Sequence, residues 1–219
     1  MTVHGFKAVA VAIAVMASGP ASAATLYTQT FDVSGSAFAS QNDSQGVGNY
    51  ATVFDNFTLF GSSTVTGLSF VGRYFNPATP SPISQFTVKF YSNNAGQVGP
   101  TLSTFSIPGD GNESCNASAI CTYTLALNFA ATGGTPYWMS IVPDAARSSQ
   151  WGWATAQGGD GASFQNFVGI VRPQSYDMAF TLTGDSAVPE PATWAMMLGG
   201  FALMGSAVRR RARLARAIG

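Results

Sequence analysis

Residues 85–90 read Gln-Phe-Thr-Val-Lys-Phe, and apolar and polar side chains alternate along this stretch with a period of two. In an extended strand this alternation puts the Phe and Val side chains on one face and the Thr and Lys side chains on the other. The same alternation recurs at 123–129 and at 176–182. A half-buried strand with one face toward a core is therefore the unit that we expect throughout this part of the chain.

Seven further stretches are predicted to be strands, because each is rich in β-branched or aromatic residues. They span residues 26–31, 50–60, 65–74, 101–107, 136–142, 149–155 and 164–171. Turn-forming Gly, Pro, Asn and Asp residues separate them, and helical periodicity longer than two turns is absent. The sequence therefore predicts one all-β domain over 24–187, an antiparallel β-sandwich with jelly-roll-like connections.

The first 23 residues have the three parts of a secretory signal peptide. Lys7 supplies the positive charge, residues 8–17 form an apolar run, and residues 21–23 read Ala-Ser-Ala. About ten apolar residues are too few to cross ~30 Å of hydrocarbon as an anchor. We expect export by the secretion machinery and cleavage by signal peptidase between Ala23 and Ala24.

Residues 188–219 form a second processing segment. Pro189 and Pro191 disfavour helix and keep the chain extended. From Pro191 to Val208 there are 18 residues without a charge, roughly 27 Å of helix at ~1.5 Å per residue. This length predicts a single transmembrane helix over 192–208. The alternative is a C-terminal core helix with a solvated basic tail.

Arginines follow this apolar stretch directly, and they predict its orientation. The tail contains five of them, at Arg209, Arg210, Arg211, Arg213 and Arg216. Because arginines resist translocation, we expect the tail to stay cytoplasmic and the β domain to lie outside.

Residues 189–195 read Pro-Glu-Pro-Ala-Thr-Trp-Ala, ahead of the apolar stretch and the arginines. This arrangement resembles the PEP-CTERM sorting domain in its PEPxxWA form. The resemblance implies a sorting motif made of Pro189, Glu190, Pro191, Trp194 and Ala195. It also implies a Gram-negative envelope and a membrane-embedded exosortase that recognises the motif and cleaves near it. The chain would then be a transient single-pass inner-membrane precursor that ends at the cell surface or in the extracellular space.

The spacing of the predicted strands at 55–68, 88–91 and 137–141 resembles that of uncharacterised lectin-like sandwich domains that precede such tails. Proteins with such tails are often linked to exopolysaccharide or biofilm matrix. The resemblance implies a sandwich fold and favours the jelly roll.

Charge and histidine content exclude several functions for residues 24–187. Four basic residues stand against nine acidic ones, a net charge of −5, and no basic cluster is present for nucleic acid. The single histidine, His4, lies in the leader, so Ser-His-Asp, Cys-His and ordinary zinc sites cannot be built. We expect no enzymatic activity. A polysaccharide hydrolase with a carboxylate pair is a less favoured alternative.

Cys115 and Cys121 lie six positions apart in a polar loop. An oxidising compartment favours a disulfide between them. A thiol or metal pair is the alternative, but it has no histidine to complete it.

Two tryptophans, Trp151 and Trp153, flank a glycine and point to the same face of an extended strand. With Trp138 they are candidates for contact with carbohydrate, because aromatic rings can stack on sugar rings. The alternative is that these large rings fill the core. A polysaccharide partner and a purely structural or adhesive envelope protein therefore both stay open.

No cofactor is predicted. Structural calcium is conceivable at residues 42–44 (Asn-Asp-Ser) or 159–161 (Gly-Asp-Gly), where carboxylates and backbone oxygens gather. The alternative is that these residues serve turns.

Overall fold

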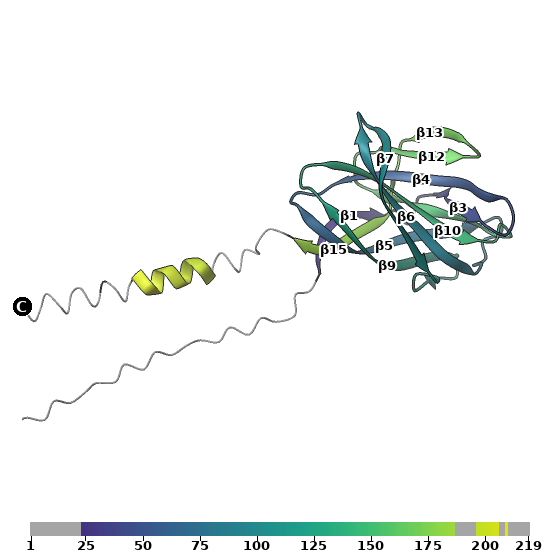
Figure 1. Ribbon diagram of the computed structural model, residues 1–219. Helices are drawn as coiled ribbons and strands as arrows, with labels where there is room; N and C mark the ends of the chain where they lie inside the picture. Colours follow the sequence, from purple (N-terminus) through teal and green to yellow (C-terminus); the bar gives the residue numbers. More distant parts are fainter. Residues whose placement is uncertain (1–22, 187–195, 206–208, 210–219) are drawn as a thin grey trace, which may run out of the picture.

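The computed structural model describes residues 23–186, 196–205 and 209. The predicted signal peptide, apart from Ala23, and the sorting motif at 189–195 lie outside the described residues. Residues 24–186 form two β-sheets and no helix, so the prediction of an all-β domain is confirmed (Figure 1).

Sheet I has the order β14-β11-β1-β15-β5-β9-β8, with β2 paired to β11. Its strands are β1 (Ala24–Phe31), β2 (Ala37–Ala39), β5 (Ser63–Phe75), β8 (Ser114–Cys115), β9 (Ile120–Ala131), β11 (Gln150–Gln157), β14 (Asp177–Met178) and β15 (Phe180–Ser186).

Sheet II has the order β13-β12-β4-β3-β10-β6-β7. Its strands are β3 (Gln41–Asp43), β4 (Gly48–Thr58), β6 (Ile83–Asn94), β7 (Gln97–Pro108), β10 (Pro136–Ala145), β12 (Ser163–Phe167) and β13 (Ile170–Gln174). All pairings are antiparallel except the short contact of β3 with β10.

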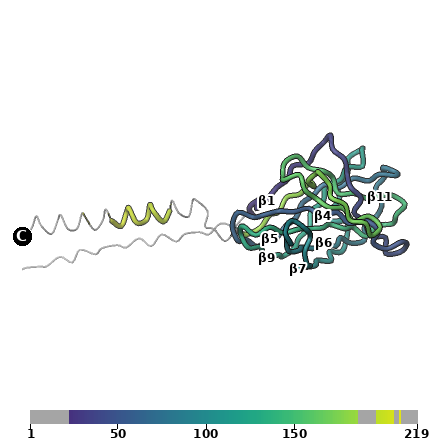
Figure 2. The backbone as a smooth tube through the Cα atoms, turned by 90° about the horizontal axis from the view of Figure 1, so that it is seen from above, coloured from purple at the N-terminus to yellow at the C-terminus, as the bar shows by residue number. Residues whose placement is uncertain are grey.

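The first and last long strands pair in the middle of sheet I, and β4, β10, β6 and β7 line up in sheet II. The chain therefore passes repeatedly between the two sheets, as it does in β-sandwiches. The backbone tube, seen after a turn of 90°, shows the labelled strands of both sheets gathered in one domain (Figure 2).

The core lies between the sheets and uses the alternation seen in the sequence. Phe86, Val88 and Phe90 on β6 are completely buried. Phe90 stacks on Phe129 of sheet I, with ring centroids 4.1 Å apart. The faces that periodicity predicted as inward are thus the faces that join the two sheets.

The stretch 164–171, predicted as one strand, is instead a hairpin of β12 and β13. Phe167 pairs with Ile170, so Val168 and Gly169 form a two-residue turn. Both turn residues have positive φ, 50° and 82°, as a turn that matches the strand twist requires. The prediction of a single strand here is wrong, because Val168 is β-branched and gives no turn signal.

Both ends of the β domain lie at one end of the sandwich. Ala24 of β1 pairs with Gly184 of β15, and Ser186 pairs with Ser63 of β5. We call this the terminal end. The 13 residues of β5 extend from Ser63 to Phe75, roughly 40 Å away at ~3.3 Å per residue, and we call that side the distal end.

Residues 196–205 form a helix within the stretch predicted as 192–208, and Arg209 is also helical. The large apolar side chains of this helix are exposed, including Met196, Leu198 and Phe201. Among the described residues, no helix has both the length and the apolar character needed to cross a membrane.

Candidate functional site

The three tryptophans proposed to contact carbohydrate are inside the protein. Trp151 and Trp153 have no exposed surface, and Trp138 is 2% exposed. The first two do share a face of β11, but pairing with β5 turns that face toward the core. Ring stacking on a sugar needs an exposed ring face, so the predicted aromatic platform is wrong and the core alternative holds.

Each indole N–H has a partner within the fold, as buried indoles usually do. The Nε1 of Trp151 donates to the Tyr123 hydroxyl at 2.9 Å, and that of Trp153 donates to the Ala179 carbonyl at 3.0 Å. Trp138 donates to Asn93 Oδ1 at 3.0 Å. The three side chains are fixed in place by these bonds.

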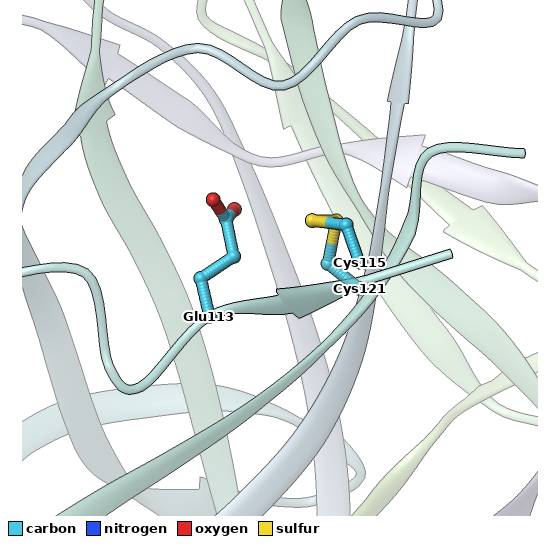
Figure 3. A group of neighbouring side chains, drawn as sticks. All are labelled: Glu113, Cys115 and Cys121. Atoms are coloured by element: carbon cyan, nitrogen blue, oxygen red, sulfur yellow. A yellow bond between two sulfur atoms is a disulfide. The ribbon is translucent and has the colours of Figure 1, made fainter. Parts of the chain in front are cut away.

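Cys115 and Cys121 form the predicted disulfide. They are directly opposite each other on β8 and β9, so the bridge links two paired strands. Glu113 lies beside it, and these three residues are a cluster of metal-ligating types (Figure 3). Because both sulfurs are in the disulfide, the cluster offers no thiolate to a metal.

The Glu113 carboxylate ties the disulfide-containing loop to the core. Its Oε1 accepts hydrogen bonds from the hydroxyls of Tyr74 and Tyr123, each at 2.7 Å. The pKa of both phenols is raised above the ordinary value. Burial is the largest cause, and the hydrogen bond to Glu113 is the next. Neither tyrosine is therefore a general base near neutral pH.

Both segments considered for calcium use their polar groups for internal hydrogen bonds. In 42–44, Asp43 Oδ2 accepts from the Arg147 N–H at 3.2 Å, and Asn42 Nδ2 and Ser44 Oγ donate to Asp144 at 2.9 and 2.7 Å. Asp160 accepts from the Ala162 N–H at 3.1 Å and from Asn56 Nδ2 at 3.0 Å. Donors occupy these carboxylate oxygens, which is the geometry of the turn alternative.

A buried carboxyl that the sequence did not single out joins the two sheets. Asp55 of β4 has no exposed surface, and it accepts hydrogen bonds from the N–H groups of Met178 on β14 (2.6 Å) and Asn56 (2.8 Å). Burial raises its pKa well above the ordinary value, and the nearby charge of Asp177 adds to the effect. Because Asp55 is fully enclosed, it is a structural group.

A surface hollow of about 460 Å³ lies at the distal end, where β5 passes into the next loop. Its lining includes Ser36, Arg73, Phe75, Asn76 and Pro77, and none of its lining residues is acidic. We call it the distal hollow. No local sequence pattern predicts this hollow, because none shows that Ser36 comes to lie beside Asn76 and Pro77.

The amide of Asn76 is held in a fixed orientation at the rim of the distal hollow. Its Nδ2 donates to Gln150 Oε1 at 3.1 Å. The Asn76 side-chain oxygen and the Ser36 hydroxyl have no hydrogen-bond partner among the described residues. A polar ligand can therefore bond to both groups.

The C-terminal region matches a known family. Residues 187–211 match the family described as "PEP-CTERM protein-sorting motif". A comparison with curated proteins finds no match. The chain therefore carries the PEP-CTERM protein-sorting motif that its sequence resembles, directly after the last strand of its β-sandwich.

Proposed function

We propose that this chain is an exported, non-catalytic surface or matrix protein that is processed by an exosortase and binds carbohydrate through its β-sandwich. The observation that carries the proposal is the PEP-CTERM match, which begins at residue 187, one residue after β15 ends. A folded sandwich thus precedes the sorting motif with little chain between them.

The arrangement of the two ends supports this route. The mature N-terminus expected at Ala24 and the start of the sorting segment after Ser186 are both at the terminal end. Nine residues, 187–195, separate β15 from the described helix, and they can span at most about 30 Å. In the precursor, this short connection would keep the terminal end close to the membrane and leave the distal end farther from it.

A non-catalytic role is supported by the chemistry of the described side chains. The domain has no histidine, its buried tyrosines have raised pKa values, and Asp55 has no access to solvent. A hydrolase would need two carboxylates facing an open groove.

Carbohydrate binding is favoured over a purely adhesive role by the distal hollow, which combines an aromatic ring, a cation and free polar groups. Sites for small ligands are typically concave, with a few well-placed polar groups. The adhesive alternative predicts that the protein binds no glycan.

Two measurements test the proposal. Screening of the purified chain on a glycan array should give binding to a restricted set of saccharides, and failure to bind any of them would favour the adhesive alternative. Fractionation of cells that contain the cognate exosortase should find wild-type protein outside the inner membrane. Glu190→Ala protein should stay in the inner membrane, and release of this variant would contradict recognition of the motif.

A further inference from the structure

The distal hollow contains one charged side chain, that of Arg73. Arg73 has no salt bridge and no side-chain hydrogen bond among the described residues. Its guanidinium is therefore available to a ligand.

The neighbours of Arg73 in the hollow are suited to a sugar. Phe75 lies two residues further along β5 and thus on the same face of the strand. Its ring packs against Gly152, where a Cβ atom would approach Phe75 to 2.8 Å, and against the small cluster of Ala39, Tyr50 and Ala51. This packing fixes an apolar surface beside the cation.

We propose that the distal hollow binds a carboxylate-bearing sugar unit of an acidic polysaccharide. The planar guanidinium of Arg73 pairs with the carboxylate through two parallel hydrogen bonds. The Phe75 ring contacts the apolar face of the sugar, and Ser36 and Asn76 bond to its hydroxyl groups. This inference rests on the proposed carbohydrate-binding function, and it adds the site and the ligand class.

The location of the hollow fits a polymeric ligand. It lies at the opposite end of β5 from Ser63, which pairs with the last residue of the sandwich. A polymer chain can therefore reach it while the precursor is still attached to the membrane, and the site stays open after processing.

The test is calorimetric titration of the full-length chain, purified in detergent, with polygalacturonate oligosaccharides and with neutral galactose oligosaccharides of the same length. Wild-type protein should bind the acidic series and bind the neutral series at least about tenfold more weakly, because the neutral series lacks the charge-assisted bonds. A higher salt concentration should weaken the binding of the acidic oligosaccharides, because salt screens the attraction between Arg73 and the carboxylate.

Arg73→Gln should weaken binding of the acidic oligosaccharide by about tenfold or more, and Arg73→Lys should lose less. The matched control is Arg172→Gln, which removes the same charge from the exposed edge strand β13 and should leave binding unchanged. Equal melting temperatures for the variants and the wild type verify that each is folded.

Three results would overturn the inference. Acidic binding that survives Arg73→Gln, or that falls equally in Arg172→Gln, would put the site elsewhere and leave the carbohydrate-binding function standing. Equal affinity for neutral and acidic oligosaccharides would refute the ligand class. Absence of binding to both series would refute this site, and absence of binding on the glycan array as well would refute the carbohydrate function. Exosortase processing, which is assayed separately, would be unaffected.

Discussion

At the scale of single residues, the tryptophans show how this interior is built. Trp153 has no exposed surface, contacts the Phe180 ring at 5.7 Å between centroids, and bonds to a buried carbonyl. Trp153→Ala would leave a cavity and remove one of the two hydrogen bonds to the Ala179 carbonyl, so we expect it to lower the free energy of unfolding by about 3–5 kcal/mol.

Urea denaturation followed by circular dichroism measures this effect. Val168→Ala, at a hairpin tip where the side chain is 69% exposed, is the control and should change stability little. A Trp153→Ala protein as stable as the wild type would show that the indole is not a core residue.

Asp55 gives the domain an unusual dependence on pH. Burial raises its folded-state pKa above the ordinary 3.8, and the pKa of Asp177 is raised in the same direction, also chiefly by burial. The folded state therefore holds these protons more tightly than the unfolded state. Their stabilising contribution is complete below about pH 3.8 and is lost as pH rises through the folded-state pKa.

We therefore expect the melting temperature to fall as pH rises from about 4 toward neutrality, and the slope to be smaller in Asp55→Asn. The mature domain has no histidine that would titrate in this range. At Asp144 burial opposes ionisation, but hydrogen bonds from Ser44, Ser84 and Asn42 outweigh it and lower the pKa. The stability that Asp144 contributes is therefore lost only as pH falls below about 3.8, outside this range. A melting temperature that is constant across this range, or a slope unchanged in the variant, would contradict the assignment.

At the scale of elements, the disulfide closes only a small loop between β8 and β9. Its loop-entropy contribution is about 2–3 kcal/mol. Because Glu113 separately ties this loop to Tyr74 and Tyr123, we expect Cys115→Ser to fold and to be less stable by about this amount. Urea denaturation of the variant should match that of reduced wild-type protein, and equal stability of oxidised and reduced wild type would refute the prediction.

The elements that the sequence predicted best are those with one buried face. Residues 85–90 and 123–129 lie in β6 and β9, where apolar and polar side chains alternate cleanly. β10 was harder to interpret, since nearly all of its residues are buried. Trp138 of β10 is buried, and the ring of Phe164 on β12 packs against it with the ring centroids 5.1 Å apart. No local sequence pattern reveals this contact.

The distal hollow was not predictable for a similar reason. Ser36 and Arg73 come together only because β2 pairs with β11, and β11 pairs with β5. Register between strands that are distant in sequence is set by the whole fold, whereas the period-two pattern reports one strand at a time. The strands are therefore predictable from local sequence, whereas this surface is not.

At the scale of the whole molecule, the pairing of the first and last strands brings both ends of the β domain together. Because β1 and β15 are antiparallel neighbours, the chain enters and leaves the sandwich at the same end. The signal peptide and the sorting segment were predicted from local sequence patterns, but their common position relative to the β domain follows from the sheet order. Removal of both segments would leave the sandwich intact, since its strands span 24–186.

The most direct test of the central claim, that the C-terminal segment is a sorting device, is the intact mass of the protein recovered from the cell surface. When the chain is produced with its cognate exosortase, we expect the mass of a chain that begins at Ala24 and ends near Pro189–Pro191. This chain would lack Arg209 and the arginines that follow. Deletion of Pro189–Pro191 should prevent cleavage, so the variant should stay in the inner membrane with its arginine tail intact. A wild-type surface protein whose mass still includes the arginine tail would contradict the account and make the segment an ordinary anchor.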